Sequence, residues 1–501
     1  MIFPGVRLRV LMLTICVVWA ACVTSSPAAT SIQSAETKEW YLCTLAKDPC
    51  GWMSSSVITT EDSRMYTTRL SLQLRRDSAQ VKSLIESRIE EGIDGSVREM
   101  VAVQELGKDR VEQRWFFLPD RIRVLVKNGR RQRTNTLALP QGDWRSTEDA
   151  LRQAIRVVGD GSEVREFICQ VLDPSLGEVP KRTVYTWEGT ENMSTSRGEF
   201  ECVRWRVEHE GSPVERIWLD TTHRLIRSVA SLGKGFGDLE IVLATQEEAT
   251  AKRKGPEIVI RSAVEPVLAE GLPRILRRTK RMRVRVTGLD GRPLMFPSIG
   301  HQRVFDDGTV CIDVSTGSPP DDVEGDYLGS TLFCDREDER IIEFAQRNIH
   351  HRNGSQSKAE SLRSAVNRHI SSKGLSTAFA SASETIRSRK GDCSEHAVLL
   401  AAVLRATNIP ARVVNGLVYV RNGGPEGRDA YVWHMWTQAL IDGTWKDFDA
   451  TLRGPLDFHA AYLAVSVNDL SQASLNASST EMLKVLGNLH IEIIEAESID
   501  P

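Results

Sequence analysis

The chain has 501 residues, of which 41% are apolar and 26% are charged, and its formal net charge is −3. This length suffices for two or three domains, and the composition is that of a globular protein rather than a disordered one. The small net charge gives no electrostatic reason to expect nucleic acid or an anionic membrane as a partner.

The N-terminus has the pattern of an export signal. Two arginines precede an apolar run from Val10 to Ala21, which is too short for a stable membrane span. We therefore predict a signal peptide and the start of a tether over residues 1–29. The protein is then expected to be exported, and to be periplasmic, part of the cell envelope or secreted.

The way the signal ends leaves two alternatives open. Cys22 follows two alanines, as at the end of a bacterial lipoprotein signal, and is then a candidate lipid anchor. Cleavage near Ala29 by an ordinary signal peptidase is the alternative. The sequence has no later run of eighteen apolar residues, so we expect no transmembrane span after the signal is removed.

Seven cysteines remain beyond the signal region. In an exported chain the first six could form disulfides and leave Cys393 as a thiol. Pairing of sequence neighbours would join Cys43 to Cys50, Cys169 to Cys202 and Cys311 to Cys334. Reduced, buried thiols are the alternative, and the sequence does not decide between them.

Residues 40–246 are predicted to form a mainly antiparallel β domain, a curved sheet or sandwich with a few helices. Runs with the alternation of strands are separated by turn signals. Helices are expected at Ala79–Glu90 and Ser146–Val157. His209 and His223 stand alone, so no catalytic constellation is expected in this domain. The predicted strands are 65–74, 110–117, 121–126, 181–190, 199–208, 214–219, 225–229 and 239–245.

A linker is predicted at 247–276, followed by a small β segment at 277–334. Within this segment Arg281, Arg283 and Arg285 alternate with apolar residues, which indicates a strand with one charged face. A solvated edge strand protected by its charge is the favoured interpretation, and an anionic ligand is the alternative.

Residues 335–495 are predicted to form a third region, with helices at 336–349 and 358–370 before a buried helix. Gly391-Asp392 is a turn and cap signal, and Ala397–Ala406 is apolar on nearly every face. Cys393 therefore lies in the first helical turn. There the backbone N–H groups and the helix dipole favour a thiolate.

Two hairpin strands follow this helix. After a strand at Ala411–Val420, a second strand at Tyr431–Ile441 carries His434, and Asp442-Gly443 is a strong hairpin turn. The returning strand ends at Asp449. Pairing about the turn is expected to place Asp449 opposite the level of His434 and Met435, so that histidine and carboxylate become neighbours.

These ordered motifs resemble the transglutaminase-like superfamily in its bacterial branch. The resemblance covers about 335–495 and rests on Gly391-Asp392-Cys393, on the helix ending in Asn408-Ile409-Pro410-Ala411-Arg412, on His434-Met435-Trp436, and on Trp445 followed by Asp449-Ala450-Thr451. Asn408 stands where the family usually has glycine, and Ala450 where proline is common.

The resemblance implies an α+β fold, in which a C-terminal papain-like core follows the β domain in the sequence. It also implies a catalytic triad in which Cys393 is the nucleophile, His434 the base and Asp449 the orienting carboxylate. The expected function is acyl transfer on protein or peptide amides, as a protease, amidase or transglutaminase. Neither a cofactor nor a metal is expected.

Three alternatives stay open at this point. A domain that keeps the fold without activity would be a binding or scaffold module. A metal site could use Cys393 and His396, three apart on one helix, together with His434 and Asp449. Asp447 is a secondary candidate for the orienting role. The sequence does not determine the oligomeric state.

Overall fold

The computed structural model describes residues 35–498, apart from 77–78, 107–108, 129–130, 159–163, 211, 234–236, 254, 257–262, 271, 273–278, 316–324, 350, 373–379 and 453–457. The predicted signal peptide and Cys22 lie outside the described residues. The chain divides near residue 260 into an N-terminal and a C-terminal compact unit. No helix in the described part of the chain is both long and apolar enough to cross a membrane.

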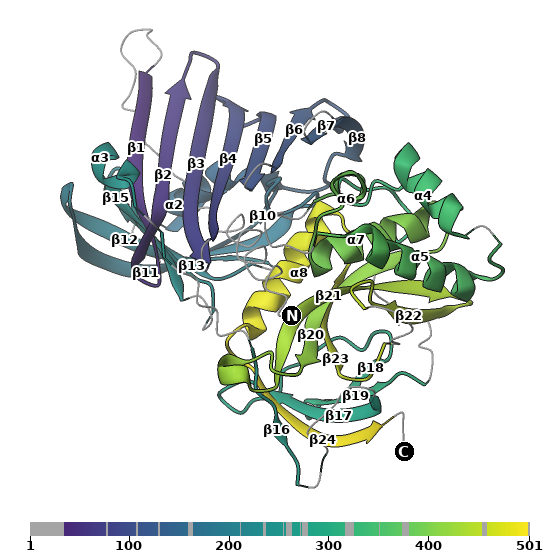
Figure 1. The fold of residues 1–501 in the computed structure, drawn as a ribbon. Helices are drawn as coiled ribbons and strands as arrows, with labels where there is room; N and C mark the ends of the chain where they lie inside the picture. The colour runs from purple at the N-terminus through teal and green to yellow at the C-terminus, as the bar shows by residue number, and fades with distance from the viewer. Residues whose placement is uncertain are drawn as a thin grey trace. The chain divides into compact units, whose positions relative to one another are not determined.

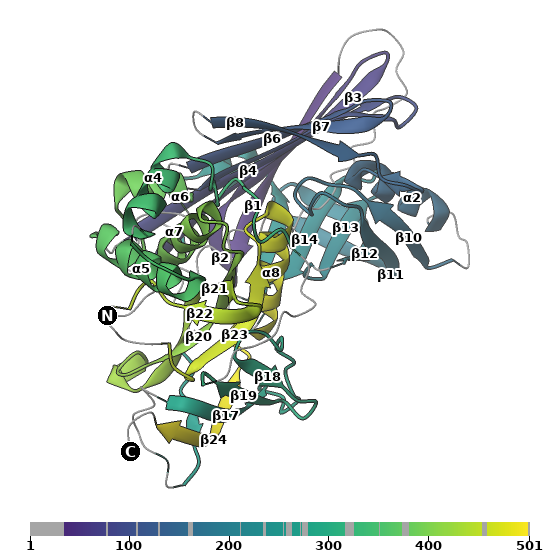
Figure 2. The ribbon, with the colours of Figure 1, turned by 90° about the vertical axis from the view of Figure 1, so that its right-hand side faces the viewer.

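The N-terminal unit is built on one 15-stranded sheet (Figures 1 and 2). Its strand order is β8-β7-β6-β5-β4-β3-β2-β1-β15-β14-β13-β12-β11-β10-β9, and the pairing is antiparallel except between β9 and β10. The strands are β1 (Ala35–Leu45), β2 (Asp48–Thr59), β3 (Ser63–Arg76), β4 (Ala79–Gly92), β5 (Val97–Leu106), β6 (Asp109–Phe117), β7 (Arg121–Asn128), β8 (Arg131–Ala138), β9 (Trp144–Arg145), β10 (Glu166–Val171), β11 (Lys181–Thr195), β12 (Gly198–His209), β13 (Glu215–Asp220), β14 (Leu225–Ser231) and β15 (Asp238–Ala244).

The predicted β domain is confirmed, and each of its eight predicted strands coincides with a strand of the sheet. The helix expected at Ser146–Val157 is α2 (Thr147–Val158). The helix expected at Ala79–Glu90 is wrong, because this segment is β4, paired along its length with β3. Its helix-forming residues misled the prediction, since neighbouring strands override such local preferences.

Because side chains alternate along a strand, every second residue of a strand can be buried in the core of the N-terminal unit. On β4, Ile85 and Ile89 are buried, and Ile89 packs with Met100, Trp115 and Ile122 in a cluster across neighbouring strands.

The six cysteines proposed to pair are separate thiols in this structure, so the neighbour disulfides are absent from it.

The C-terminal unit contains two sheets and a layer of helices. The first sheet has the order β16-β24-β17-β19-β18 and the second β22-β21-β20-β23. Helices α4 to α7 lie on one side of β20 to β22 (Figures 1 and 2). The elements are β16 (Val267–Leu268), β17 (Thr279–Thr287), β18 (Gln302–Val304), β19 (Thr309–Asp313), α4 (Glu339–Ile349), α5 (Ser355–His369), α6 (Ala382–Ser388), α7 (Cys393–Ala406), β20 (Ala411–Val420), β21 (Ala430–Ile441), β22 (Thr444–Phe448), β23 (Tyr462–Asn468), α8 (Gln472–Val485) and β24 (His490–Ser498).

The interpretation of the basic segment as an edge strand is wrong. Strand β17 lies inside its sheet, between β24 and β19. Its arginines pair with carboxylates on these two neighbours: Arg281 with Asp313, Arg283 with Glu495 and Arg285 with Glu492. These cross-strand ion pairs account for the charged face without an anionic ligand.

Helices α7 and α8 pack on the second sheet. Helix α7 packs against β20 and β21, and helices α4, α5 and α6 pack against α7. Helix α8 packs against β23 and β20. Helix α8 begins after Ser471, which caps it by accepting the backbone N–H of Ser474. Helix α7 is therefore buried between these three helices and the sheet, and Cys393 is its first residue.

Candidate active site

Cys393 is the first residue of α7, as the cap signal predicts. The Asp392 side chain accepts the backbone N–H of Glu395 and also that of Ser394, the latter at 2.9 Å, and the Glu395 side chain in turn accepts the N–H of Asp392 at 2.8 Å. This reciprocal pair is a capping box, which satisfies N–H groups that the helix itself leaves without acceptors. The helix start, and with it the thiol, is therefore fixed by the residues beside Cys393.

The residues around the cap are buried and closely packed. A Cβ added to Gly391 would lie 2.3 Å from Glu395 Cβ, so only glycine fits there. Glu395 also accepts the backbone N–H of Ala380 at 3.1 Å. The motif Gly391-Asp392-Cys393 thus combines a close approach, a cap and the thiol in three consecutive residues.

His396 holds the same turn rather than pointing to a metal. Its Nδ1 lies 2.6 Å from the carbonyl oxygen of Asp392, and because a carbonyl only accepts, Nδ1 donates. In the described residues, no group of three or more His, Cys, Asp or Glu side chains is arranged to hold a metal ion. The four residues of the metal alternative are therefore not gathered as ligands.

His434 and Asp449 are brought together as predicted. His434 Nε2 lies 2.8 Å from Asp449 Oδ2, and both side chains are about 2% exposed or less. The carboxylate accepts, so Nε2 carries the proton, and in the neutral ring Nδ1 is then the basic nitrogen. This is the relation that a base and its orienting carboxylate require.

The register of the hairpin differs from the predicted one. The β21–β22 ladder ends with Thr437 opposite Phe448, and Asp449 follows the last residue of β22. Continued by one residue, the pairing places Asp449 beside Trp436, not at the level of His434 and Met435. The carboxylate reaches His434 along the same face, two residues away.

Asp449 accepts four hydrogen bonds. Its Oδ1 accepts the backbone N–H and the hydroxyl of Thr451, and its Oδ2 accepts the hydroxyl of Tyr462 and Nε2 of His434. Burial alone would raise the pKa of Asp449, but the charge of His434 and the hydrogen bonds from His434 and Thr451 outweigh burial and hold this pKa well below its usual range. Asp449 is therefore ionised at neutral pH.

Aromatic rings enclose the imidazole. Trp436 stacks with His434 at 6.3 Å between ring centroids, and Tyr462 meets His434 edge-on at 5.9 Å. Tyr462 also packs edge-on against Trp436. These contacts restrict the orientation of the ring and exclude water from it.

Asp447 does not take the orienting role. Its Oδ1 accepts the indole N–H of Trp436 and the side-chain amide of Gln438, each at 2.7 Å. The secondary assignment is therefore wrong, and Asp447 instead fixes the ring that stacks on His434. Because the indole N–H of Trp436 is used in this way, it is not a donor to an oxyanion.

The nucleophile and the base lie on elements that pack together. The Thr437 hydroxyl on β21 donates to the carbonyl oxygen of Ala397 on α7 at 3.0 Å. Thr437 and His434 point to opposite faces of β21, because side chains alternate along a strand. This contact therefore fixes the helix on the strand.

The structure explains the identity of two motif residues, one by backbone conformation and one by packing. Asn408, at the position usually held by glycine, has φ of 60°, a left-handed conformation that asparagine also adopts. The Arg412 guanidinium lies over the Trp445 ring at 3.9 Å from its centroid. The departure from the family pattern at Asn408 therefore preserves the turn.

Sequence reasoning missed Tyr462 and Thr451 as partners of the carboxylate. Thr451 had a signal, since a threonine two residues after an aspartate commonly returns a hydrogen bond to it. Tyr462 had none. Its strand, β23, pairs with β20, and no local pattern shows that pairing.

Comparison with known proteins agrees with the sequence motifs. Residues 342–450 match the family model of the Transglutaminase-like superfamily, and this range contains Cys393, His434 and Asp449. A crystal structure of a candidate cysteine protease from Cytophaga hutchinsonii matches with 17% identity and a TM-score of 0.27, covering 45% of this chain and 88% of that one. No curated protein matches the chain.

Proposed function

Residues 342–450 form a transglutaminase-like domain, and from this premise we propose that the protein is an exported thiol enzyme that transfers acyl groups from protein or peptide amides. Cys393 is the nucleophile, His434 the base and Asp449 the residue that orients the base. The observation that carries the proposal is the buried 2.8 Å bond between His434 and Asp449 on the strands beside the helix of Cys393.

The reaction follows from these three groups. His434 Nδ1 takes the thiol proton, and the thiolate attacks a carboxamide or peptide carbonyl. The backbone N–H of Cys393, at the start of α7, donates to the oxyanion. His434 then returns the proton to the leaving amine, and a thioester remains.

The thioester is resolved by water or by a second amine. Attack by water completes hydrolysis and releases the acid, whereas attack by an amine completes transamidation. We favour hydrolysis, as protease or amidase, because the sequence offers no dedicated site for an amine acceptor.

One observation favours a second candidate function. The Cys393 residue is 0% exposed and His434 is 2% exposed. A substrate carbonyl must reach the thiol, and a transglutaminase-like domain that keeps this closed arrangement would be a binding or scaffold module rather than an enzyme.

The pH dependence of alkylation separates the two functions. Iodoacetamide labelling of the folded protein is followed by mass spectrometry from pH 5 to 10, in the wild type and in His434→Ala. Cys334 is an internal control in the same digest, because burial raises its pKa to about 11. For an enzyme, Cys393 reacts well below the usual thiol pKa of about 8.5 and slows in His434→Ala.

An unreactive or ordinarily titrating Cys393 in the folded sample would favour the binding module. A labelled peptide library, incubated with and without an added primary amine, then distinguishes hydrolysis from transamidation by the mass of the product. Export is tested separately by N-terminal sequencing of the mature protein from the cell envelope and the medium.

A further inference from the structure

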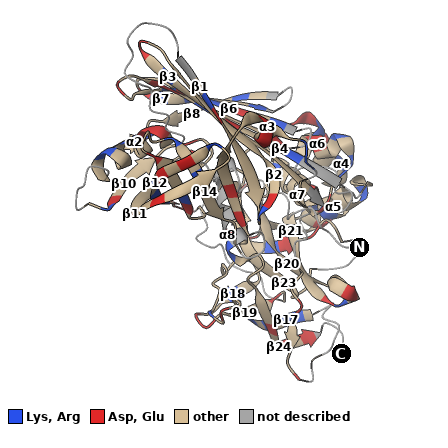
Figure 3. Cartoon of the chain, turned by 90° about the vertical axis from the view of Figure 1, so that its left-hand side faces the viewer, with Lys and Arg blue, Asp and Glu red and all other residues tan. Residues whose placement is uncertain are grey.

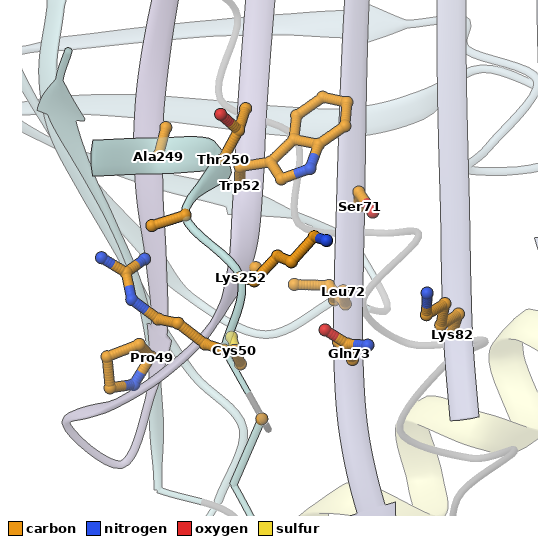
Figure 4. A pocket seen from close by; sticks show the side chains of 14 residues that line it. Pro49, Cys50, Trp52, Ser71, Leu72, Gln73, Lys82, Ala249, Thr250 and Lys252 are labelled. Atoms are coloured by element: carbon orange, nitrogen blue, oxygen red, sulfur yellow. The ribbon is translucent and has the colours of Figure 1, made fainter. Parts of the chain in front are cut away.

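A pocket of about 170 Å³ lies in the N-terminal unit, where the segment after α3 (Gln246–Thr250) crosses β2 and β3. Figure 4 shows Lys252 extending over the pocket between Trp52 and Leu72, with Lys82 on the neighbouring strand. This pocket lies in a different unit from Cys393 and His434 and plays no part in the proposed acyl transfer.

At two glycines of the pocket lining, the backbone lies unusually close to a carbonyl oxygen of β3. A Cβ added to Gly51 would lie 1.9 Å from the Ser71 carbonyl oxygen, and one added to Gly255 would lie 2.1 Å from the Gln73 carbonyl oxygen. Gly255 also has φ of 51°, which disfavours other residues. The approach at Gly51 belongs to the β2–β3 ladder, whereas the approach at Gly255 brings the backbone after α3 against that of β3, so the pocket does not depend on side-chain positions alone.

The floor of the pocket is one face of the sheet. Trp52 pairs with Ser71 across β2 and β3, and Gln73 pairs with Lys82 across β3 and β4. Directly opposed residues share a face, and Ser71 and Gln73 are two apart on one strand. An indole, a hydroxyl, an amide and an ammonium group therefore line the same side.

All charged side chains that line the pocket are positive. Lys82, Lys252 and Arg253 are among its residues, and none of the lining residues is acidic. Within the described part of the chain, no ion pair engages these three cations. Arg253 lies within electrostatic reach of Glu248, but that carboxylate accepts from Ser196 and belongs to the capping box of α3.

The rest of the sheet is arranged differently. Lys and Arg are interspersed with Asp and Glu along its strands (Figure 3). Arginines on the strands pair with carboxylates across the ladder, as in Arg69–Glu86, Arg204–Glu188 and Arg227–Glu240. A pocket whose three cations form no ion pair with any described residue, and whose other polar groups are neutral, departs from this pattern.

We propose that this pocket binds a phosphoryl group, as inorganic phosphate or the head of a small phosphomonoester. A phosphate dianion balances the three positive charges of the pocket better than a carboxylate, which carries one negative charge. Arg253 can donate two parallel hydrogen bonds to phosphate oxygens. The amide of Gln73 and the hydroxyl of Ser71 add neutral donors on the floor. The ring of Trp52 forms a flat wall for the organic part of a monoester.

The test is isothermal titration of the full mature chain with inorganic phosphate at low ionic strength, where such contacts are least screened. Glycerol 3-phosphate in a parallel arm distinguishes an esterified ligand from free phosphate. The pocket variant is Lys252→Gln/Arg253→Gln. The matched control is Arg121→Gln/Lys127→Gln, which removes the same charge at exposed positions of β7.

The expected result is saturable binding at one site per chain, at least tenfold weaker in the pocket variant and unchanged in the β7 control. Tighter binding of glycerol 3-phosphate would identify an ester as the ligand, and equal binding would identify phosphate itself. The proposal is overturned if neither compound binds saturably, or if the pocket variant and the control weaken binding equally. Circular dichroism of both variants confirms that they are folded.

Discussion

Tyr462 donates its hydroxyl hydrogen bond to Asp449 Oδ2 at 2.7 Å, and the same oxygen accepts His434 Nε2 at 2.8 Å. The tyrosine belongs to β23, the histidine to β21, and the aspartate follows β22. A hairpin and a later strand therefore converge on one carboxylate oxygen. The position of the imidazole depends on all of them.

Removing the tyrosine hydroxyl should impair the site without unfolding the protein. In Tyr462→Phe we expect alkylation of Cys393 and amide turnover to slow about tenfold, since a hydrogen bond to a charged group contributes roughly 1.5–3 kcal/mol. The pH profile of alkylation should also shift, because Asp449 loses one of the four hydrogen-bond donors that stabilise its charge.

The matched control is Tyr431→Phe, a buried tyrosine of β21 whose hydroxyl contacts Met282 instead of the site. A Tyr462→Phe profile that coincides with the wild type would show that Tyr462 only packs. A wild type without an activated thiol would instead count against the enzyme itself.

Neutralising the orienting carboxylate should have a larger effect. In Asp449→Asn the side chain can present its amide to His434, which favours the wrong tautomer, so we expect amide turnover to fall by at least about a hundredfold. The protein should stay folded, with a near-native circular dichroism spectrum. Steady-state kinetics on a peptide amide measures the effect, and a loss smaller than that of Tyr462→Phe would contradict the role of Asp449.

Arg405 is predicted to stabilise the helix–sheet packing through backbone contacts. Its buried guanidinium donates to the carbonyl oxygens of Ala411, Gly329 and Asp469 at 2.8–2.9 Å. Arg405→Met leaves these acceptors without donors, and we expect a loss of roughly 3–5 kcal/mol in the free energy of unfolding.

Urea unfolding followed by tryptophan fluorescence measures this loss. Arg347→Met, an exposed arginine on α4, is the control and should change stability by less than about 0.5 kcal/mol. Equal stability of the two variants would argue against the role assigned to Arg405.

The stability of the N-terminal unit should depend on the protonation of Glu148. Burial above all, together with the nearby charges of Glu91 and Asp173 and against the opposing charge of Arg152, raises the pKa of Glu148 to about 8. The folded state therefore binds a proton that the unfolded state releases near pH 4.5. This contribution is fully present below that pH and is lost as the pH rises through about 8.

Replacing Glu148 by glutamine removes this titration. We expect Glu148→Gln and the wild type to have similar Tm values at pH 5. At pH 9 we expect the variant to have the higher Tm, with a free energy of unfolding larger by about 3 kcal/mol. Glu166→Gln, at an exposed position of β10, is the control. A Tm difference that does not grow with pH would exclude the buried carboxyl as its source.

The parts of the fold that sequence predicted correctly depend on nearby residues. Helix α7 starts at Cys393 because Asp392 and Glu395 cap it within one turn. The β21–β22 hairpin follows from Asp442-Gly443, whose positive φ values of 50° and 78° suit that turn. Each is a relation over a few residues, which a pattern can express.

The predictions for β4 and β17 were wrong because the conformation or position of each strand depends on pairing with other segments of the chain. Residues 79–90 form β4 because β3 and β5 flank them, although the residue types favour a helix. Strand β17 lies inside its sheet because β24, about 200 residues later in the chain, pairs with it. Pairing at this separation leaves no local signal.

The sequence by itself determined the order and chemistry of the site: a thiol at a capped helix start, a histidine on a later strand and an aspartate beyond a hairpin turn. Only the tertiary structure decided that Tyr462 and Thr451 hold Asp449, that Asp447 fixes Trp436, and that Cys393 is fully buried. Caps and turns arise from neighbouring residues, whereas hydrogen bonds between strands and the burial of a side chain depend on which segments pack together.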